Sequence, residues 1–81
     1  MLLEVLIAAS DMAALAAGLA ITLASVAGAL SMAFSIRKAI DGIAKQPEAD
    51  GKIRSSLVLG LVFIETAIIY AMVVGLLILV L

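Results

Sequence analysis

The sequence predicts an all-α membrane protein built as one hairpin of two transmembrane helices. Hydrophobic residues make up 67% of its 81 residues, and its mean hydropathy is +1.39. A soluble domain of this size carries far more polar surface. Charged residues are absent from Met12 to Ile36, and a single one interrupts the run from Ser55 to Leu81. At about 1.5 Å per residue, each run is long enough to cross a hydrocarbon core of roughly 30 Å as a helix.

The elements follow in order along a single domain. We expect helix one at about residues 5–38, a polar loop at about 39–54 and helix two at about 55–81. Gly42, Pro47 and Gly51 are the expected breakers within the loop. All 5 Lys and Arg residues lie between Arg37 and Arg54. The positive-inside rule therefore places the loop in the cytoplasm and both termini on the opposite side, and we expect a bacterial plasma membrane.

The first run does not have the pattern of a cleaved signal peptide. Glu4 stands where a basic region is expected, and the apolar stretch is too long. We therefore expect it to belong to the mature protein, with Glu4 and Asp11 solvated at the outer surface.

The composition excludes several kinds of function. Without cysteine or histidine the chain forms no disulfide, no thiolate metal site and no histidine-based acid–base site. It also lacks a basic patch with interleaved aromatic residues, so we expect no nucleic-acid partner.

Small side chains recur at spacings of four and three along one face of the first helix. The members of this seam are Ala13, Ala17, Ala20, Ala24, Ala27, Ser31 and Ser35. Such seams let helix backbones approach closely in lipid. The second helix carries bulky aliphatic residues. A helix with small side chains paired with one that has large side chains gives the hairpin a wedge-shaped cross-section. Repeated wedges close into a ring with the first helix inside, although the seam alone is equally compatible with packing the hairpin on itself.

One carboxylate, Glu65, interrupts the second apolar run near the middle of the membrane. An ionised acid that faces lipid at this depth costs at least a few kcal/mol. No Lys, Arg or His lies in either span to pair with it. Glu65 therefore needs a bound proton or a bound metal cation, and intramembrane acids are by default functional residues.

Two hydroxyl residues, Thr66 and Tyr70, follow four residues apart on an adjacent helix face. Both are candidate ligands, because a hydroxyl donates to a carboxylate or accepts from its proton. The alternative for Thr66 is a hydrogen bond to the carbonyl of Val62. The alternative for Tyr70 is a place in the interfacial aromatic belt.

These features resemble the rotor-ring proteolipid, or c-subunit, of F-type ATP synthases over nearly the whole chain. The family's loop centres on Arg-Gln-Pro, which Lys45-Gln46-Pro47 matches with Lys in place of Arg. The family's essential carboxylate falls on Glu65 and its hydroxyl pair on Thr66 and Tyr70. The first helix of the family carries small residues, usually glycines, at alternate positions. Here those positions hold Ser25, Ala27, Ala29, Ser31 and Ala33.

The resemblance implies a non-catalytic, ion-translocating rotor component without a cofactor other than its ion. Identical copies form a ring in the membrane lipid, and each Glu65 carries one ion past a stator subunit whose arginine faces it. The loop, including Lys45, Gln46 and Pro47, contacts the central stalk. The alternative from another class is a small pore-forming or exporter-type hairpin with a buried acid. A pore needs a polar stripe along a whole helix, and neither helix has one.

The residues around Glu65 include features of both a proton site and a sodium site. Sodium-carrying relatives place Gln or Glu at the position of Met32, and a thioether is a poor ligand for a hard cation. Thr66 and Tyr70 fit the sodium pattern, and the backbone carbonyl of Phe63 is available to either ion. We favour a proton at Glu65 and keep sodium as the alternative.

Overall fold

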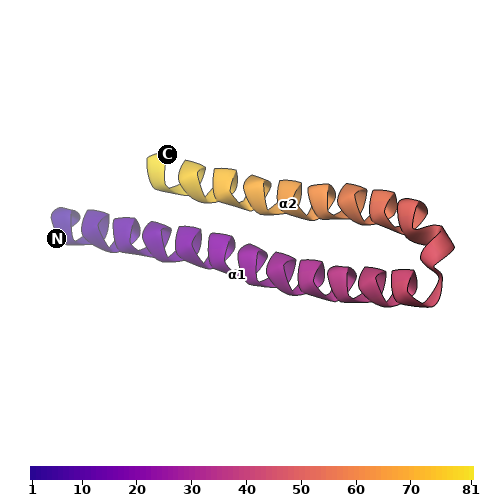
Figure 1. Ribbon diagram of the computed structural model, residues 1–81. Coiled ribbons are helices and arrows are strands. Elements are labelled where there is room, and N and C mark those ends of the chain that lie inside the picture. Colours follow the sequence, from indigo (N-terminus) through magenta and orange to yellow (C-terminus); the bar gives the residue numbers. More distant parts are fainter.

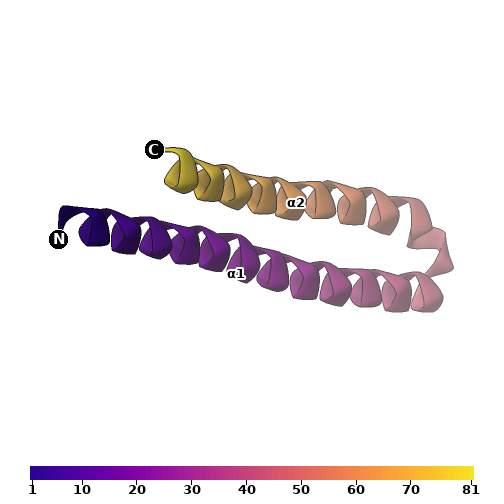
Figure 2. The same ribbon diagram turned by 90° about the vertical axis from the view of Figure 1, so that its left-hand side faces the viewer.

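The computed structural model describes all 81 residues and forms a hairpin of two long antiparallel helices (Figure 1). Helix α1 runs Leu2–Lys45 and α2 runs Asp50–Val80, joined by one 3₁₀ turn, η1, at Pro47–Ala49. The helices stay side by side when the view is turned by 90° (Figure 2). The molecule measures 68 × 16 × 6 Å. The predicted all-α two-helix hairpin is confirmed, whereas the ring and the inner place of α1 concern an assembly and stay predictions.

The connection between the helices is much shorter than the predicted loop at 39–54. Residues 39–45 continue α1 and residues 50–54 begin α2. Gly42 and Gly51 were expected to break these helices, but neither has a positive φ and both are helical. Only Pro47 ends α1: proline disfavours the helical conformation of the preceding residue, and Gln46 has φ −134° and ψ 75°.

The two helices pack through glycines that receive isoleucines of the opposite helix. A Cβ added at Gly75 would lie 2.8 Å from Cδ1 of Ile21, and one at Gly42 would lie 3.2 Å from Cδ1 of Ile53. Gly28 likewise faces the side chain of Ile68. The buried and half-buried positions that form this face of α2 are Ile53, Leu57, Leu61, Ile64, Ile68, Ala71, Gly75 and Ile78. Their spacing of four and three residues is that of a coiled-coil seam.

The hairpin has almost no interior of its own. Only 4 of 81 residues are buried. Both helices are long and apolar enough to cross a membrane. In the most apolar 18-residue stretch of each, 11% of the residues are buried in α1 and 6% in α2. These fractions are too small for the core helices of a soluble protein. Residues 1–10 are all exposed, and α1 extends past the end of α2 at the end where both termini lie (Figure 1).

Candidate ion-binding site

Glu65 lies at the centre of α2, about 20 Å from each end of the helix. Its side chain is exposed on the hairpin and pairs with no cation. The single ion pair of the molecule joins Arg54 Nη2 to Asp50 Oδ1 at 3.0 Å, close to the turn. The carboxylate thus stands alone at the depth where lipid would surround it.

The hairpin has two different long sides, or flanks, beside the seam where its helices meet. The groove flank is defined by a groove of about 300 Å³, which is lined by Ala24, Ala27, Gly28, Ser31, Ile64, Ala67 and Ile68. A rotation of about 100° per residue places Glu65 on the opposite side of α2 from Ala67. The Glu65 flank consists of Ser25, Ala29 and Met32 on α1 and Val62, Glu65 and Ile69 on α2.

The predicted site residues do not all meet within one chain. Met32 is half-buried and shares the Glu65 flank. Tyr70 is about 140° from Glu65 around α2, and Phe63 is about 160° from it. Thr66 is about 100° from Glu65 and turns away from α1. A site that includes all five residues therefore needs the Glu65 flank of one chain and the opposite side of α2 of another.

The two hydroxyl residues differ in their hydrogen bonds. Thr66 Oγ1 donates to the carbonyl of Val62 at 2.8 Å, as the alternative interpretation of this residue expected. Its donor is thereby used, but its oxygen lone pairs remain free to accept a hydrogen bond or to bind a cation. The Tyr70 hydroxyl makes no hydrogen bond, and the residue is 67% exposed. Tyr70 thus offers both a donor and an acceptor to a second chain.

Comparison with known proteins supplies the family. The family of ATP synthase C subunits matches residues 15–78, which include the turn and most of both helices. The chain belongs to the ATP synthase C-subunit family. It is 46% identical over 67 residues to the chloroplastic ATP synthase c-subunit of Emiliania huxleyi, covering 83% of this chain and 82% of that protein.

Membership of the ATP synthase C-subunit family, together with the two apolar helices, makes the chain an integral membrane protein with two spans. The orientation of the hairpin stays a prediction. The bacterial plasma membrane also stays a prediction, and the relative reported above is a chloroplast protein.

The structure divides the small-residue seam of α1 between two surfaces. Ala17 is 2% exposed because it packs against α2 at Gly75. Ala13, Ala20 and Ala24 are half-buried, whereas Ala27 is exposed. Ser31 is exposed beside Ala27 on the groove flank, and Ser35 is half-buried nearer the turn. The part of the seam nearer the termini thus packs the hairpin on itself, while Ala27 and Ser31 are available to another chain.

The predicted stalk-contact residues lie at the tip of the hairpin. Lys45, Gln46 and Pro47 are all exposed. The Gln46 N–H donates to the carbonyl of Gly42 at 2.9 Å, and the Ala49 N–H donates to that of Gln46 at 2.9 Å. These bonds fix the turn, so the tip presents its side chains from a defined backbone.

Sequence reasoning missed a groove that contains Lys38 and Lys52, because it assigned residues 39–54 to a loop. The seam of α1 continues through Ser35, Ala39 and Gly42 at spacings of four and three. That continued spacing was the signal for two packed helices at this depth, with a surface between them.

Proposed function

We propose that the chain is the ion-translocating, non-catalytic rotor subunit of an F-type ATP synthase. The observation that carries this proposal is Glu65, the single charged residue of α2 beyond Arg54, placed at the centre of the helix without a cation. A carboxylate at this depth is stable when it is loaded with a cation or paired with one. Glu65 binds and releases one ion per site.

The two flanks support a ring of identical copies. The Glu65 flank presents Val62, Glu65 and Ile69 as a ridge, and the groove flank presents the small residues Ala27 and Ala67. A ridge on one side and a groove on the other fit a head-to-tail contact, which generates a ring when its rotation closes. Glu65 and Met32 of one copy then lie beside Phe63, Thr66 and Tyr70 of the next.

Rotation follows from the difference between the loaded and the empty site. A loaded Glu65 is neutral and passes through lipid, whereas an empty carboxylate needs a partner. An arginine of the stator is that partner, because it displaces the ion at one half-channel and prevents the empty site from turning back. Each charge that crosses contributes about 2.3 kcal/mol per 100 mV. The exposed tip with Gln46 and Pro47 lies on the cytoplasmic side and contacts the central stalk.

The ion is a proton in this proposal. A proton needs one acceptor or donor beside Glu65, which the Tyr70 hydroxyl, the Thr66 oxygen or the Phe63 carbonyl of the next copy provides. Sodium needs several oxygen ligands, and Met32 offers sulfur on the side where sodium-carrying relatives have an amide or carboxylate.

The test is the substitution Glu65→Gln, which keeps the shape of the side chain and removes its titratable group. We expect ion transport and coupled ATP synthesis to be abolished while the ring still assembles. The matched control is Glu4→Gln, an acid of α1 far from the membrane centre, which should leave both activities unchanged. ATP synthesis sustained by Glu65→Gln rings would disprove the role of Glu65.

A further inference from the structure

The groove of the groove flank has a single polar side chain in its lining, that of Ser31 on α1. The other lining residues are alanine, glycine or isoleucine. Ser31 is exposed, and its hydroxyl forms no hydrogen bond within the hairpin, whereas the Thr66 hydroxyl donates to the carbonyl of Val62. A hydroxyl in apolar surroundings is costly unless it is hydrogen-bonded. Ser31 therefore offers an unused donor in an apolar groove.

Ser31 and Glu65 lie at nearly the same depth along the hairpin. The side chains of Ile64 and Ile68 lie against Gly28. Glu65 lies between these isoleucines along α2, and Ser31 is about 4.5 Å beyond Gly28 along α1, in the direction of the turn. The two side chains are on opposite flanks, so they do not meet within one chain. Rotation about a ring axis keeps every residue at its depth, so Glu65 of one copy is level with Ser31 of the next.

The groove has hydrogen-bonding groups on both of its sides. Ser31 lies on the side of α1. On the side of α2, Phe63 and Tyr70 are about 40° and 60° from Ala67 around the helix, so they border the groove. A protonated carboxyl has a donor on one oxygen and an acceptor on the other. When the groups of α2 accept from the O–H of Glu65, its second oxygen needs a donor from the side of α1.

We propose that Ser31 of the adjacent copy is a further ligand of Glu65. Its hydroxyl donates to the carbonyl oxygen of the loaded carboxyl, while the Glu65 O–H donates to the Tyr70 hydroxyl or the Phe63 carbonyl. Two hydrogen bonds from different helices fix the orientation of the carboxyl, so the loaded site stays closed while it passes through lipid. This inference rests on the proposed ion carrier and deepens it, because it adds an oxygen of α1 to a site whose other oxygens come from α2.

The test is infrared difference spectroscopy between low and high pH on rings in lipid. The carbonyl band of loaded Glu65 is identified by its absence from Glu65→Gln rings. A donor to a carbonyl oxygen lowers the stretching frequency, so Ser31→Ala should shift this band to higher frequency and Ser31→Thr should restore it. An unchanged band in Ser31→Ala rings, as expected if the hydroxyl donates to the carbonyl of Ala27 instead, would overturn the proposal.

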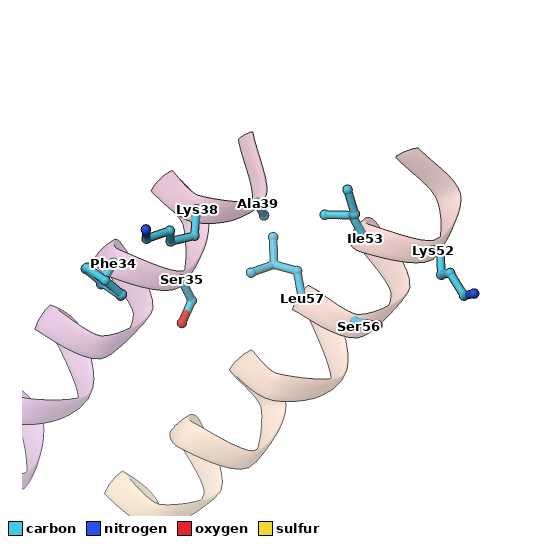
Figure 3. Close-up of a pocket in the computed structure, with 8 residues that line it drawn as sticks. All are labelled: Phe34, Ser35, Lys38, Ala39, Lys52, Ile53, Ser56 and Leu57. Atoms are coloured by element: carbon cyan, nitrogen blue, oxygen red, sulfur yellow. The ribbon is translucent and has the colours of Figure 1, made fainter. Parts of the chain in front are cut away.

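The matched control is Ser35→Ala, which removes the same hydroxyl from the next turn of α1, about 6 Å nearer the connection between the helices. Ser35 lines a separate groove of about 500 Å³, together with Ile53 and Leu57 of α2 (Figure 3). Its substitution should leave the band unchanged, and equal shifts in both variants would refute a specific contact. Failure of the ion carrier itself is measured separately, as ATP synthesis by Glu65→Gln rings.

A second measurement needs no substitution and covers the case in which Ser31→Ala rings fail to assemble. In unaltered rings labelled with carbon-13, solid-state NMR should show a cross-peak between Ser31 Cβ and Glu65 Cδ. Because these residues lie on opposite flanks of one chain, the cross-peak reports a contact between two copies. Its absence from assembled rings would contradict the proposal.

Discussion

The two flanks of the hairpin are built from the same two helices but carry opposite shapes. The Glu65 flank has branched aliphatic side chains on α2, and Val62 and Ile69 are 54% and 48% exposed there. The groove flank has alanines on both helices and encloses a groove of about 300 Å³. At the depth of Glu65, one flank bears a charge beside branched side chains, and the other is a groove without charged residues.

This difference in shape supports the head-to-tail contact proposed above. A two-fold contact between Glu65 flanks would place two carboxylates close together in lipid. A two-fold contact between groove flanks would leave both Glu65 flanks without a neighbour. A head-to-tail contact places ridge in groove and gives every copy the same environment. In the proposed ring each Glu65 lies at a boundary between chains, and the proposed ion site is complete only in the assembly.

The largest effect is expected from a carbodiimide that reacts with protonated carboxyls in apolar surroundings. Of the 6 acidic residues, only Glu65 lies in the middle of a span. We expect label on Glu65 alone, with complete loss of ion transport after one modification per ring. Peptide mapping by mass spectrometry identifies the labelled residue, and label on Glu4 or Asp11 as well would remove the distinction between Glu65 and the solvated acids.

The same reaction sharpens the assignment of the ion. At fixed pH, millimolar sodium should not protect Glu65 from the carbodiimide, because Met32 supplies no oxygen on this flank. The labelling rate should follow pH alone. Protection by sodium but not by potassium would overturn the proton and establish sodium as the carried ion.

The next largest effect concerns the contact between flanks. The chain has no cysteine, so any disulfide that forms must join cysteines introduced by mutation. Ala27 and Ala29 are exposed about 160° apart around α1, one on each flank. Mild oxidation of the double variant Ala27→Cys/Ala29→Cys should give a ladder of covalent oligomers, because disulfides form only when the two Cα atoms lie within about 7 Å.

The single cysteine variants are the controls for this ladder. In a head-to-tail contact each single variant places its cysteine opposite an alanine, so neither should form a dimer. Strong dimerisation of Ala27→Cys alone would indicate a two-fold contact between groove flanks, and the ring proposed above would be wrong.

How far the sequence predicted this molecule depends on the kind of signal. The hairpin and the position of Glu65 could be predicted, because long uncharged runs and a lone acid are properties of the chain itself. The ends of the helices could not be predicted. Gly42 and Gly51 lower the helix propensity of the chain, and whether a helix ends at a glycine depends on its packing against other residues. Gly42 lies against Ile53 of α2, and such packing between helices stabilises a helix against the low propensity of glycine. The sequence also did not predict that the small-residue seam is exposed at Ala27 rather than packed against α2, since this depends on which face of α1 is covered by α2.

A moderate effect is expected where the helices contact each other. At Gly75, Ile21 Cδ1 lies 2.8 Å and Ile21 Cγ1 2.9 Å from the position of an added Cβ. Gly75→Leu should therefore destabilise the hairpin by about 1–3 kcal/mol through overpacking. Detergent titration, followed by energy transfer between dyes on cysteines introduced at Ser10 and Leu81, measures the separation of the helices.

Substitutions at two other glycines distinguish effects on the stability of the hairpin from effects on the stability of the ring. Gly18 and Gly51 have nothing within 4 Å of an added Cβ. Gly51→Leu should leave the hairpin unchanged to within about 0.5 kcal/mol, as for a surface substitution. Gly18→Leu should also spare the hairpin but weaken the ring, because Gly18 lies on the same side of α1 as Ala29. If Gly18→Leu rings are as stable as the unaltered ones, the small residues of this flank do not form the contact.

The smallest effect is expected at the pair of Asp50 and Arg54, where the Glu65 side of the hairpin leaves the membrane. Arg54 Nη2 lies 3.0 Å from Asp50 Oδ1, and the two side chains are 69% and 45% exposed. Such solvated pairs four residues apart on a helix stabilise by roughly 0.3–0.5 kcal/mol. A double-mutant cycle with Asp50→Asn and Arg54→Gln, measured on the separated hairpin and on the assembly, should give this coupling in both. A coupling above about 1.5 kcal/mol in the assembly alone would show that the neighbouring copy desolvates the pair, and the contact between flanks would then extend to the turn.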